Sequence, residues 1–402
     1  MPNANPAAYA VDVSRSPATV LTPVPVAAVS LAGEFWGPRV QRNLATTLPT
    51  QYALLESTGR LNNFRRVTGD CSDPYAGIFF NDSDVYKWIE AASWAQAKGP
   101  VPALQTCIDE AITLIEAAQD VDGYINTYFS VERKGQRWTD LRDLHEMYCG
   151  GHLIQAAVAH HRATGSTRLL TVACRFADLL CTLFGPADQG KRVAVDGHEE
   201  IEMALVELWR ETGHARYLAQ ARFFIDARGQ GLLHSGRWGL EYFQDHVPYR
   251  QMQQLCGHAV RALYMVCGVT DVVLETGDAE LLALLESQWT HLTTRRMYIT
   301  GGLGARHDGE SLGKDFELPN ARAYTETCAA IGSMMWCHRM LAATGKARYA
   351  DLIEWTLYNG MLPGWSLDFV QRHAARLVAG RQPLLLRQPA GRRRQPPPPG
   401  LV

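Results

Sequence analysis

Residues 160–180 read HHRATGSTRLLTVACRFADLL, which is a helix pattern, a Thr-Gly break and a second helix pattern. Glycine takes the left-handed conformation that ends a helix, and apolar residues recur at helical spacing on both sides of Gly165. The same arrangement surrounds Gly213, Gly277 and Gly345, in the stretches LWRETGHARYLAQARFFI, VVLETGDAELLALLESQW and RMLAATGKARYADLIEWTLYNG. The pattern therefore predicts four helical hairpins.

A fifth hairpin is predicted over residues 82–119, with its turn at residues 98–100, Lys-Gly-Pro. The intervals between the four hairpin glycines are 48, 64 and 68 residues. These are too irregular for a short solenoid repeat, but they suit hairpins separated by long functional loops. We expect an all-α fold in which the hairpins close into an α/α barrel. An open α-solenoid is the competing architecture, because periodicity alone does not separate the two.

Composition narrows the function classes. The 402 residues are 47% hydrophobic and 20% charged, with a net charge of −2, so a globular protein is expected, without nucleic acid or an anionic membrane as partner.

The N-terminus lacks a basic region before its apolar stretch, which indicates no secretory signal and a cytoplasmic location. Residues 258–277 form the most apolar helix candidate, but Arg261, Asp271 and Glu275 interrupt it, so no transmembrane segment is expected. The nine cysteines form no CxxC pair and are expected to be reduced thiols.

Three histidines stand at equivalent places, where a long loop runs into the next helix: His145, His198 and His258. Any one of them alone is more often a structural residue. Loops of a helical ring converge at one end, so three histidines in equivalent settings favour a polar pocket that binds hydroxyl groups there.

Acidic residues gather later in the chain. Glu310 lies in a glycine-rich loop, Glu317 precedes Leu-Pro-Asn, and Glu326 begins the last long hairpin. Glycosidic chemistry needs a proton donor at the leaving oxygen and a nucleophile or base opposite it. Solvated acids in a loop and at a helix start are an equally good interpretation of these residues alone.

Glu326 and Cys328 are a candidate metal pair. They lie about 200° apart on an ideal helix, so they share a metal only from an extended or first-turn geometry. Zinc accepts carboxylate and thiolate ligands but takes about four donors, and Cys337 projects from the opposite helix face. Taken alone, Cys328 is better interpreted as a core cysteine.

Eight blocks of the sequence, taken together, resemble glycoside hydrolase family 127, the β-L-arabinofuranosidases. The resemblance covers about residues 30 to 368. The blocks stand in the expected order: FWGPRVQRN, FNDSDVYKWIEAASW, QDVDGYINTYF, RWTDLRDLHEMYCGGHLIQAAVAHHRATG, GHEEIEMALVEL, MYITGGLG, ELPNARAYTETCAAIG and YADLIEWTLYNG.

The resemblance implies an (α/α)6 barrel followed by β-sandwich domains, and retaining release of β-L-arabinofuranose from the non-reducing ends of glycans or oligosaccharides. It implies a zinc-bound cysteine nucleophile and a glutamate acid/base that is kept protonated to donate to the leaving oxygen. Mapped onto this sequence, the implied roles fall on Glu326 and Cys328 as zinc ligands, Glu310 as acid/base, and His145, His198, His258 and, more weakly, Gln51 as sugar contacts.

This sequence departs from the family pattern at its end. The family has adjacent cysteines, one of them the nucleophile, downstream of the YNG region, whereas this sequence has no cysteine after Cys337. After Asp368 it carries seven Arg and six Pro but no Lys, Asp or Glu. We therefore expect an extension at 1–30, a barrel domain at 31–368 that is incomplete at its end and lacks the β-sandwich domains, and a disordered tail at 369–402 translated out of frame. Such a chain is expected to be inactive or impaired.

Two other functions stay open: a non-catalytic helical barrel that binds sugar through its histidines, and another α/α-barrel carbohydrate enzyme, such as an epimerase or unsaturated-sugar hydrolase, that needs neither zinc nor Cys328. An arabinofuranoside-containing glycan is the expected partner, and a homodimer is the predicted oligomer.

Overall fold

The computed structural model describes residues 8–365. Residues 1–7 and 366–402 lie outside the described residues, and the predicted Arg/Pro-rich tail falls among them. Within residues 8–365 the fold is all-α, since only isolated β-bridges and no strands occur there. No helix in this part of the chain is both long and apolar enough to cross a bilayer.

The five predicted hairpins are confirmed. The glycines that follow Thr164, Thr212, Thr276 and Thr344 end their helices in the left-handed conformation, with φ between 68° and 77°. The hairpins are α4 (Asp82–Ala95) with α5 (Pro102–Ala118), α7 (Glu146–Thr164) with α8 (Arg168–Leu183), α9 (Ile201–Thr212) with α10 (Ala215–Ala227), α11 (Ala259–Thr276) with α12 (Ala279–Arg295), and α13 (Thr327–Thr344) with α14 (Ala347–Thr356).

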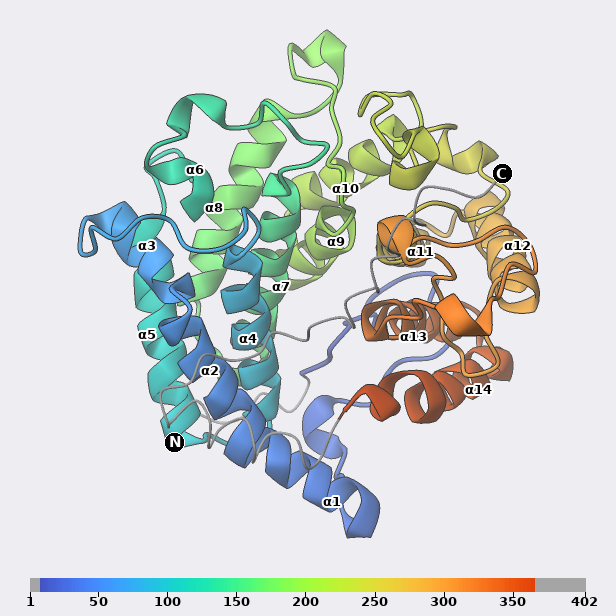
Figure 1. The fold of residues 1–402 in the computed structure, drawn as a ribbon, viewed down its shortest axis with the longest axis horizontal. Coiled ribbons are helices and arrows are strands. Elements are labelled where there is room, and N and C mark those ends of the chain that lie inside the picture. The colour runs from blue at the N-terminus through green and yellow to red at the C-terminus, as the bar shows by residue number, and fades with distance from the viewer. Residues whose placement is uncertain (1–7, 366–402) are drawn as a thin grey trace, which may run out of the picture. The chain divides into compact units, whose positions relative to one another are not determined.

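The first helix of each hairpin lies inside the ring and the second outside it. Helices α4, α7, α9, α11 and α13 pack side by side in that order, and each has its hairpin partner on its outer side (Figure 1). Burial agrees with this arrangement, because 16 of the 18 residues of α11 are buried but only 5 of the 17 residues of α12. The all-α barrel expected from the hairpins is therefore confirmed.

Small residues let the inner helices approach each other closely. A Cβ atom added to Gly151 of α7 would lie 2.5 Å from Cγ of Glu200, and one added to Gly268 of α11 would lie 2.8 Å from Cβ of Glu202. Real Cβ atoms do not come this close to other carbons, so glycine is required where α7 and α11 flank the beginning of α9.

The N-terminal helices complete the ring. They are α1 (Gly33–Arg42), α2 (Leu48–Ser57) and α3 (Arg60–Thr68), and a short helix α6 (Thr127–Ser130) follows α5. Helix α2 packs on α4. The rings of Phe35 and Trp36 in α1 lie 5.7 and 6.0 Å from the ring of Tyr358, which follows α14. Contacts between residues more than 300 positions apart therefore join the two ends of the helical ring.

The segment before α1 covers the C-terminal ends of the inner helices. Its Val13 is fully buried against Leu274 and Ala342, the backbone N–H of Ala18 donates to Leu274 O, and that of Val20 donates to Ala342 O. These carbonyls belong to α11 and α13, near their C-terminal ends. One end of the barrel is thus closed by this segment, which leaves the N-terminal ends of the inner helices to form the other.

Candidate functional site

The predicted histidines lie in a row at the N-terminal ends of α7, α9 and α11. The ring centroids of His145 and His198 are 5.5 Å apart, and those of His198 and His258 are 5.7 Å apart. His145 and His258 are the residues immediately before α7 and α11, and His198 lies three residues before α9. The inner helices run parallel to one another, so loops far apart in the sequence meet at one end of the barrel.

Two of the histidines present an unprotonated Nε2 atom. Nδ1 of His145 lies 2.7 Å from the carbonyl oxygen of Asp143, and Nδ1 of His198 lies 2.9 Å from that of Glu199. A carbonyl only accepts, so Nδ1 carries the hydrogen in both rings and Nε2 is left as an acceptor. Burial, and then the charge of Arg261, lowers the pKa of His145 to about 3 and that of His198 well below its usual range. Both rings are therefore neutral acceptors at neutral pH.

His258 has the opposite tautomer. Its Nδ1 accepts from the backbone N–H groups of Val260 and Arg261 at 3.1 and 3.4 Å, so it caps α11. Nε2 therefore carries the hydrogen and donates to Oε2 of Glu310 at 3.1 Å. Burial lowers the pKa of His258, although the hydrogen bond to Glu310 opposes this effect.

Glu310 is held by two donors. Besides His258, the hydroxyl of Tyr324 donates to its Oε1 at 3.0 Å. The hydrogen bond from His258 is the main reason that the pKa of Glu310 is lowered, and Tyr324 adds to it. This direction is opposite to the protonated acid/base that the family resemblance implies, so Glu310 is ionised in the free protein at neutral pH. Its φ of 50° is in the left-handed region, a strained conformation that is common at functional sites.

Glu326 and Cys328 lie at the start of α13. Glu326 precedes the helix with an extended backbone, φ −68° and ψ 152°, and Cys328 is the second residue of the helix. Burial, and then the charge of Glu310, raises the pKa of Glu326 to about 7. Cys328 is an exposed residue, but partial desolvation of its thiol, with Glu326 nearby, raises its pKa.

These two residues fit half of a zinc site. Oε1 of Glu326 is buried without a hydrogen-bond partner, and carboxylate and thiolate are both donors that zinc accepts. In residues 8–365, however, no group of three or more His, Cys, Asp or Glu side chains is placed to hold a metal ion. Cys337 is fully buried and its sulfur accepts from the indole N–H of Trp289 at 3.3 Å, so it is a core residue.

Two other predicted residues form no hydrogen bond with the histidines within residues 8–365. Gln51 is exposed on α2, and within the described residues no hydrogen bond joins it to the histidines. Glu317 forms an ion pair with Arg306 at 2.7 Å, which lowers its pKa to about 2. Glu317 therefore stabilises the loop after Glu310 rather than joining the site.

Sequence reasoning missed the residues that contact the predicted ones. Tyr324 binds Glu310, and the rings of Phe80 and Tyr148 lie 5.1 and 5.4 Å from that of His145. The ring of Tyr148 is also 4.4 Å from that of His198. Tyr324, two residues before Glu326, and Tyr148, three residues after His145, had a local signal; the contacts of Phe80 with His145 and of Tyr148 with His198 depend on how the helices pack.

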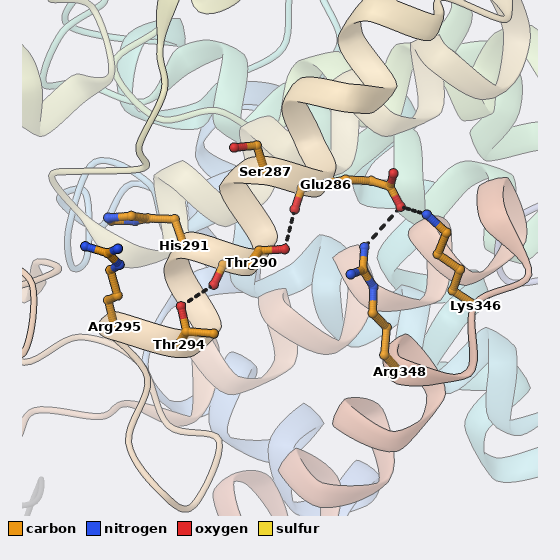
Figure 2. A pocket seen from close by; sticks show the side chains of 8 residues that line it. All are labelled: Glu286, Ser287, Thr290, His291, Thr294, Arg295, Lys346 and Arg348. Carbon is orange, nitrogen blue, oxygen red and sulfur yellow. Dashed lines mark hydrogen bonds and ion pairs between the residues drawn. The ribbon is translucent and has the colours of Figure 1, made fainter.

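A separate hollow of about 510 Å³ lies on the outer helix α12 and the beginning of α14 (Figure 2). The Glu286 carboxylate in it is paired with Lys346 and, at 3.0 Å, with Arg348, as Figure 2 shows. None of the predicted site residues lines this hollow, and its one carboxylate is already paired with two cations, so the histidine row is the better candidate for a functional site.

Comparisons with known proteins give a consistent result. Residues 28–373 match the family described as "Beta-L-arabinofuranosidase, GH127 catalytic domain". The chain is 36% identical over 381 residues to a non-reducing end β-L-arabinofuranosidase of Bifidobacterium longum subsp. longum, covering 85% of this chain and 57% of that protein.

Solved structures of the same family are also similar to this chain. A GH127 β-L-arabinofuranosidase from Geobacillus stearothermophilus T6 has a TM-score of 0.82 and 40% identity, over 85% of this chain and 57% of that one. A second solved GH127 β-arabinofuranosidase has a TM-score of 0.81 and 38% identity, and the match covers 91% of this chain and 56% of that one. The chain thus spans little more than half the length of these relatives.

Proposed function

Since this chain belongs to glycoside hydrolase family 127, we propose that its histidine row recognises a non-reducing-end β-L-arabinofuranosyl group and that Glu310 serves as acid/base in retaining hydrolysis. The observation that carries this proposal is that His145, His198 and His258 lie side by side with Glu310 bonded to the last of them. The same end of the barrel carries Glu326 and Cys328.

Sugar recognition follows from the tautomers. Nε2 of His145 and Nε2 of His198 are acceptors, so each can take a hydrogen bond from a sugar hydroxyl. The rings of Phe80 and Tyr148 beside them offer apolar surface to the carbon faces of the sugar. Because both histidines are neutral, a neutral pentose fits this row better than an anionic sugar does.

Glu310 has the right neighbours for the base half of the reaction. Ionised and held by His258 and Tyr324, it can take a proton from water. The acid half needs the same carboxyl protonated. We propose that the bound sugar excludes water from Glu310 and that this desolvation raises its pKa before the leaving oxygen is protonated.

We further propose that Glu326 and Cys328 are ligands of a zinc ion. When bound, zinc would make thiolate available at neutral pH. This chain contributes two donors and its sequence has no cysteine after Cys337, so the cysteine nucleophile that the resemblance implies has no counterpart among its 402 residues. We therefore propose that the 402-residue chain binds zinc weakly and binds arabinofuranosides with little or no turnover.

The test combines three measurements on the 402-residue chain: zinc content after dialysis, hydrolysis of an aryl β-L-arabinofuranoside, and stabilisation by L-arabinose. We expect little zinc and little hydrolysis, with stabilisation approaching about 2.7 kcal/mol at a hundredfold excess of sugar over its Kd. His198→Asn should abolish the stabilisation, whereas His214→Asn, an exposed histidine beside α10, should leave it unchanged.

Each part of the proposal has its own contrary outcome. Absence of stabilisation by the sugar would contradict recognition by the histidine row. Full hydrolysis that survives Cys328→Ala would contradict the zinc-thiolate proposal and favour another type of α/α-barrel carbohydrate enzyme. Sugar-dependent stabilisation of a chain that holds zinc but hydrolyses nothing favours a non-catalytic sugar-binding barrel, the second candidate function.

A further inference from the structure

Arg261 is a buried cation behind the histidine row. It is the third residue of α11, and its side chain is almost fully enclosed, with 7% of the residue exposed. Five other arginines are buried in residues 8–365, and each of them forms an ion pair with a carboxylate; they are Arg66, Arg162, Arg210, Arg228 and Arg339. Arg261 is the one without such a partner in this part of the chain.

The acids nearest to Arg261 are engaged elsewhere. Glu199 is paired with Arg228 at 3.0 Å, and Oδ2 of Asp196 accepts from the backbone N–H of Tyr148 at 2.9 Å. Burial also raises the pKa of both acids, that of Glu199 to about 7. The guanidinium lies instead over two aromatic rings. Its Cζ atom is 5.0 Å from the ring centroid of Tyr242 and 5.0 Å from that of Phe243.

The hydrogen bonds of Arg261 join two parts of the row. Its Nη1 donates to the carbonyl oxygen of Gly197 at 2.5 Å, immediately before His198. Its backbone N–H donates to Nδ1 of His258. The loop that carries His198 is thus fixed to the first turn of α11, next to the histidine that binds Glu310.

We propose that Arg261 is a positioning residue of the proposed sugar site: it fixes the Gly197–His198 loop against α11, and its uncompensated charge adds to burial in keeping His145 and His198 in the neutral form whose Nε2 accepts hydrogen bonds. The charged and titratable groups that face it are Asp196, Glu199, Arg228, Tyr242, the three histidines and Glu310. Histidine in its ordinary state changes charge near pH 6.5, and Glu199, whose pKa burial raises to about 7, changes charge in the same range.

This proposal rests on the proposed function, because a protonated Nε2 would no longer accept a hydrogen bond from a sugar hydroxyl. A carboxylate partner for Arg261 would cancel the charge that disfavours imidazolium. Without that partner, the charge of Arg261 adds to burial in keeping His145 and His198 neutral in a pocket that also holds the carboxylates Glu310 and Glu326.

Histidine proton titration, followed by NMR of the 402-residue chain, tests the inference without any sugar. In the unmodified chain the rings of the row should titrate below the ordinary histidine midpoint of about 6.5. Arg261→Gln keeps a donor but loses the charge, and should raise the titration midpoint of at least one of these rings by about one unit, a tenfold change in proton affinity. Arg261→Lys keeps the charge and should leave the midpoints where they were.

The control is Arg175→Gln, since Arg175 also donates to backbone carbonyls but is exposed on α8. It should change no midpoint of the row. Unchanged midpoints in Arg261→Gln, or an equal rise in Arg261→Lys, would overturn the proposal. Because no sugar enters the measurement, failure of sugar recognition and failure of this inference give different results.

Discussion

Arg210 is the centre of a buried ionic network, and its removal should destabilise the barrel strongly. It is 5% exposed on α9. Its Nη1 donates to Glu207 at 2.5 Å and to Asp271 at 2.8 Å, and its Nε donates to Glu275 at 2.6 Å. Arg210→Met keeps an unbranched apolar chain of similar reach but removes the charge from among three carboxylates.

The size of the effect follows from what each carboxylate retains. Glu207 keeps Arg162 at 2.7 Å and Asp271 keeps Arg339 at 2.7 Å. Glu275 keeps only the hydroxyl of Ser16 at 2.5 Å. One buried carboxylate is thus left without a cation, which costs about 3 to 5 kcal/mol. This is a large part of the 5 to 15 kcal/mol by which domains are typically stable.

Urea unfolding, followed by helical circular dichroism at pH 8, measures this loss. The double variant Arg210→Met with Glu275→Leu removes the orphaned acid, so it should recover most of the lost free energy of unfolding. Burial already raises the pKa of Glu275, against the effect of Arg210, and loss of Arg210 raises it further. A raised folded-state pKa costs stability only as pH rises through it, so the penalty of the single variant should shrink at pH 5.

Two results would refute this reasoning. A loss below about 1 kcal/mol for Arg210→Met would mean that water or relaxation compensates Glu275. A double variant no more stable than the single one would mean that the loss comes from packing, not from the unpaired acid. Lys346→Met, at an exposed ion pair immediately before α14, is the control and should cost less than about 1 kcal/mol.

Three further outcomes are expected. His145, with its pKa lowered to about 3 in the fold, contributes stability that is lost as pH drops from about 6.5, because the unfolded chain binds a proton there that the folded chain does not; His145→Asn should therefore lower the slope of the unfolding free energy against pH by up to about 1.4 kcal/mol per pH unit in unfolding titrations. Gly151→Ala should cost about 1 to 3 kcal/mol in urea unfolding, because its Cβ would meet Glu200 at 2.5 Å, and an unchanged midpoint would contradict the close packing of α7 on α9. Val13→Ala should cost about 2 kcal/mol, since Val13 is fully buried, whereas Val24→Ala, 63% exposed, should have almost no effect; equal effects would show that the N-terminal segment does not pack on the barrel in solution.

The hairpins were predictable because their signals are local. A glycine that must adopt positive φ and apolar residues at helical spacing act within a few positions of each other, as at Gly165 and Gly277. The positions of His145, His198 and His258 at loop-to-helix junctions were predictable for the same reason. Their distances were not, because these depend on parallel inner helices brought together by packing.

Charges on α11 show what the sequence left undecided. Arg261, Asp271 and Glu275 were evident as residues that exclude a membrane span, but not as partners of anything. In the folded protein, Asp271 and Glu275 form ion pairs with Arg210 of α9. Arg261 lies behind the histidines without a carboxylate partner among the described residues. The two ends of α11 thus have different roles, which depend on the residues packed against each end.

The sequence by itself determined the helices, their pairing into hairpins, the family, and the residues that carry the candidate chemistry. Only the tertiary structure decided that Phe35 and Trp36 meet Tyr358 to complete the ring, that Glu310 is bound and ionised by His258, and that Glu326 and Cys328 have no third donor within residues 8–365. The physical reason is range. Turn and helix preferences act between neighbours in the chain, whereas burial, charge pairing and pKa depend on groups that folding alone brings within a few ångströms.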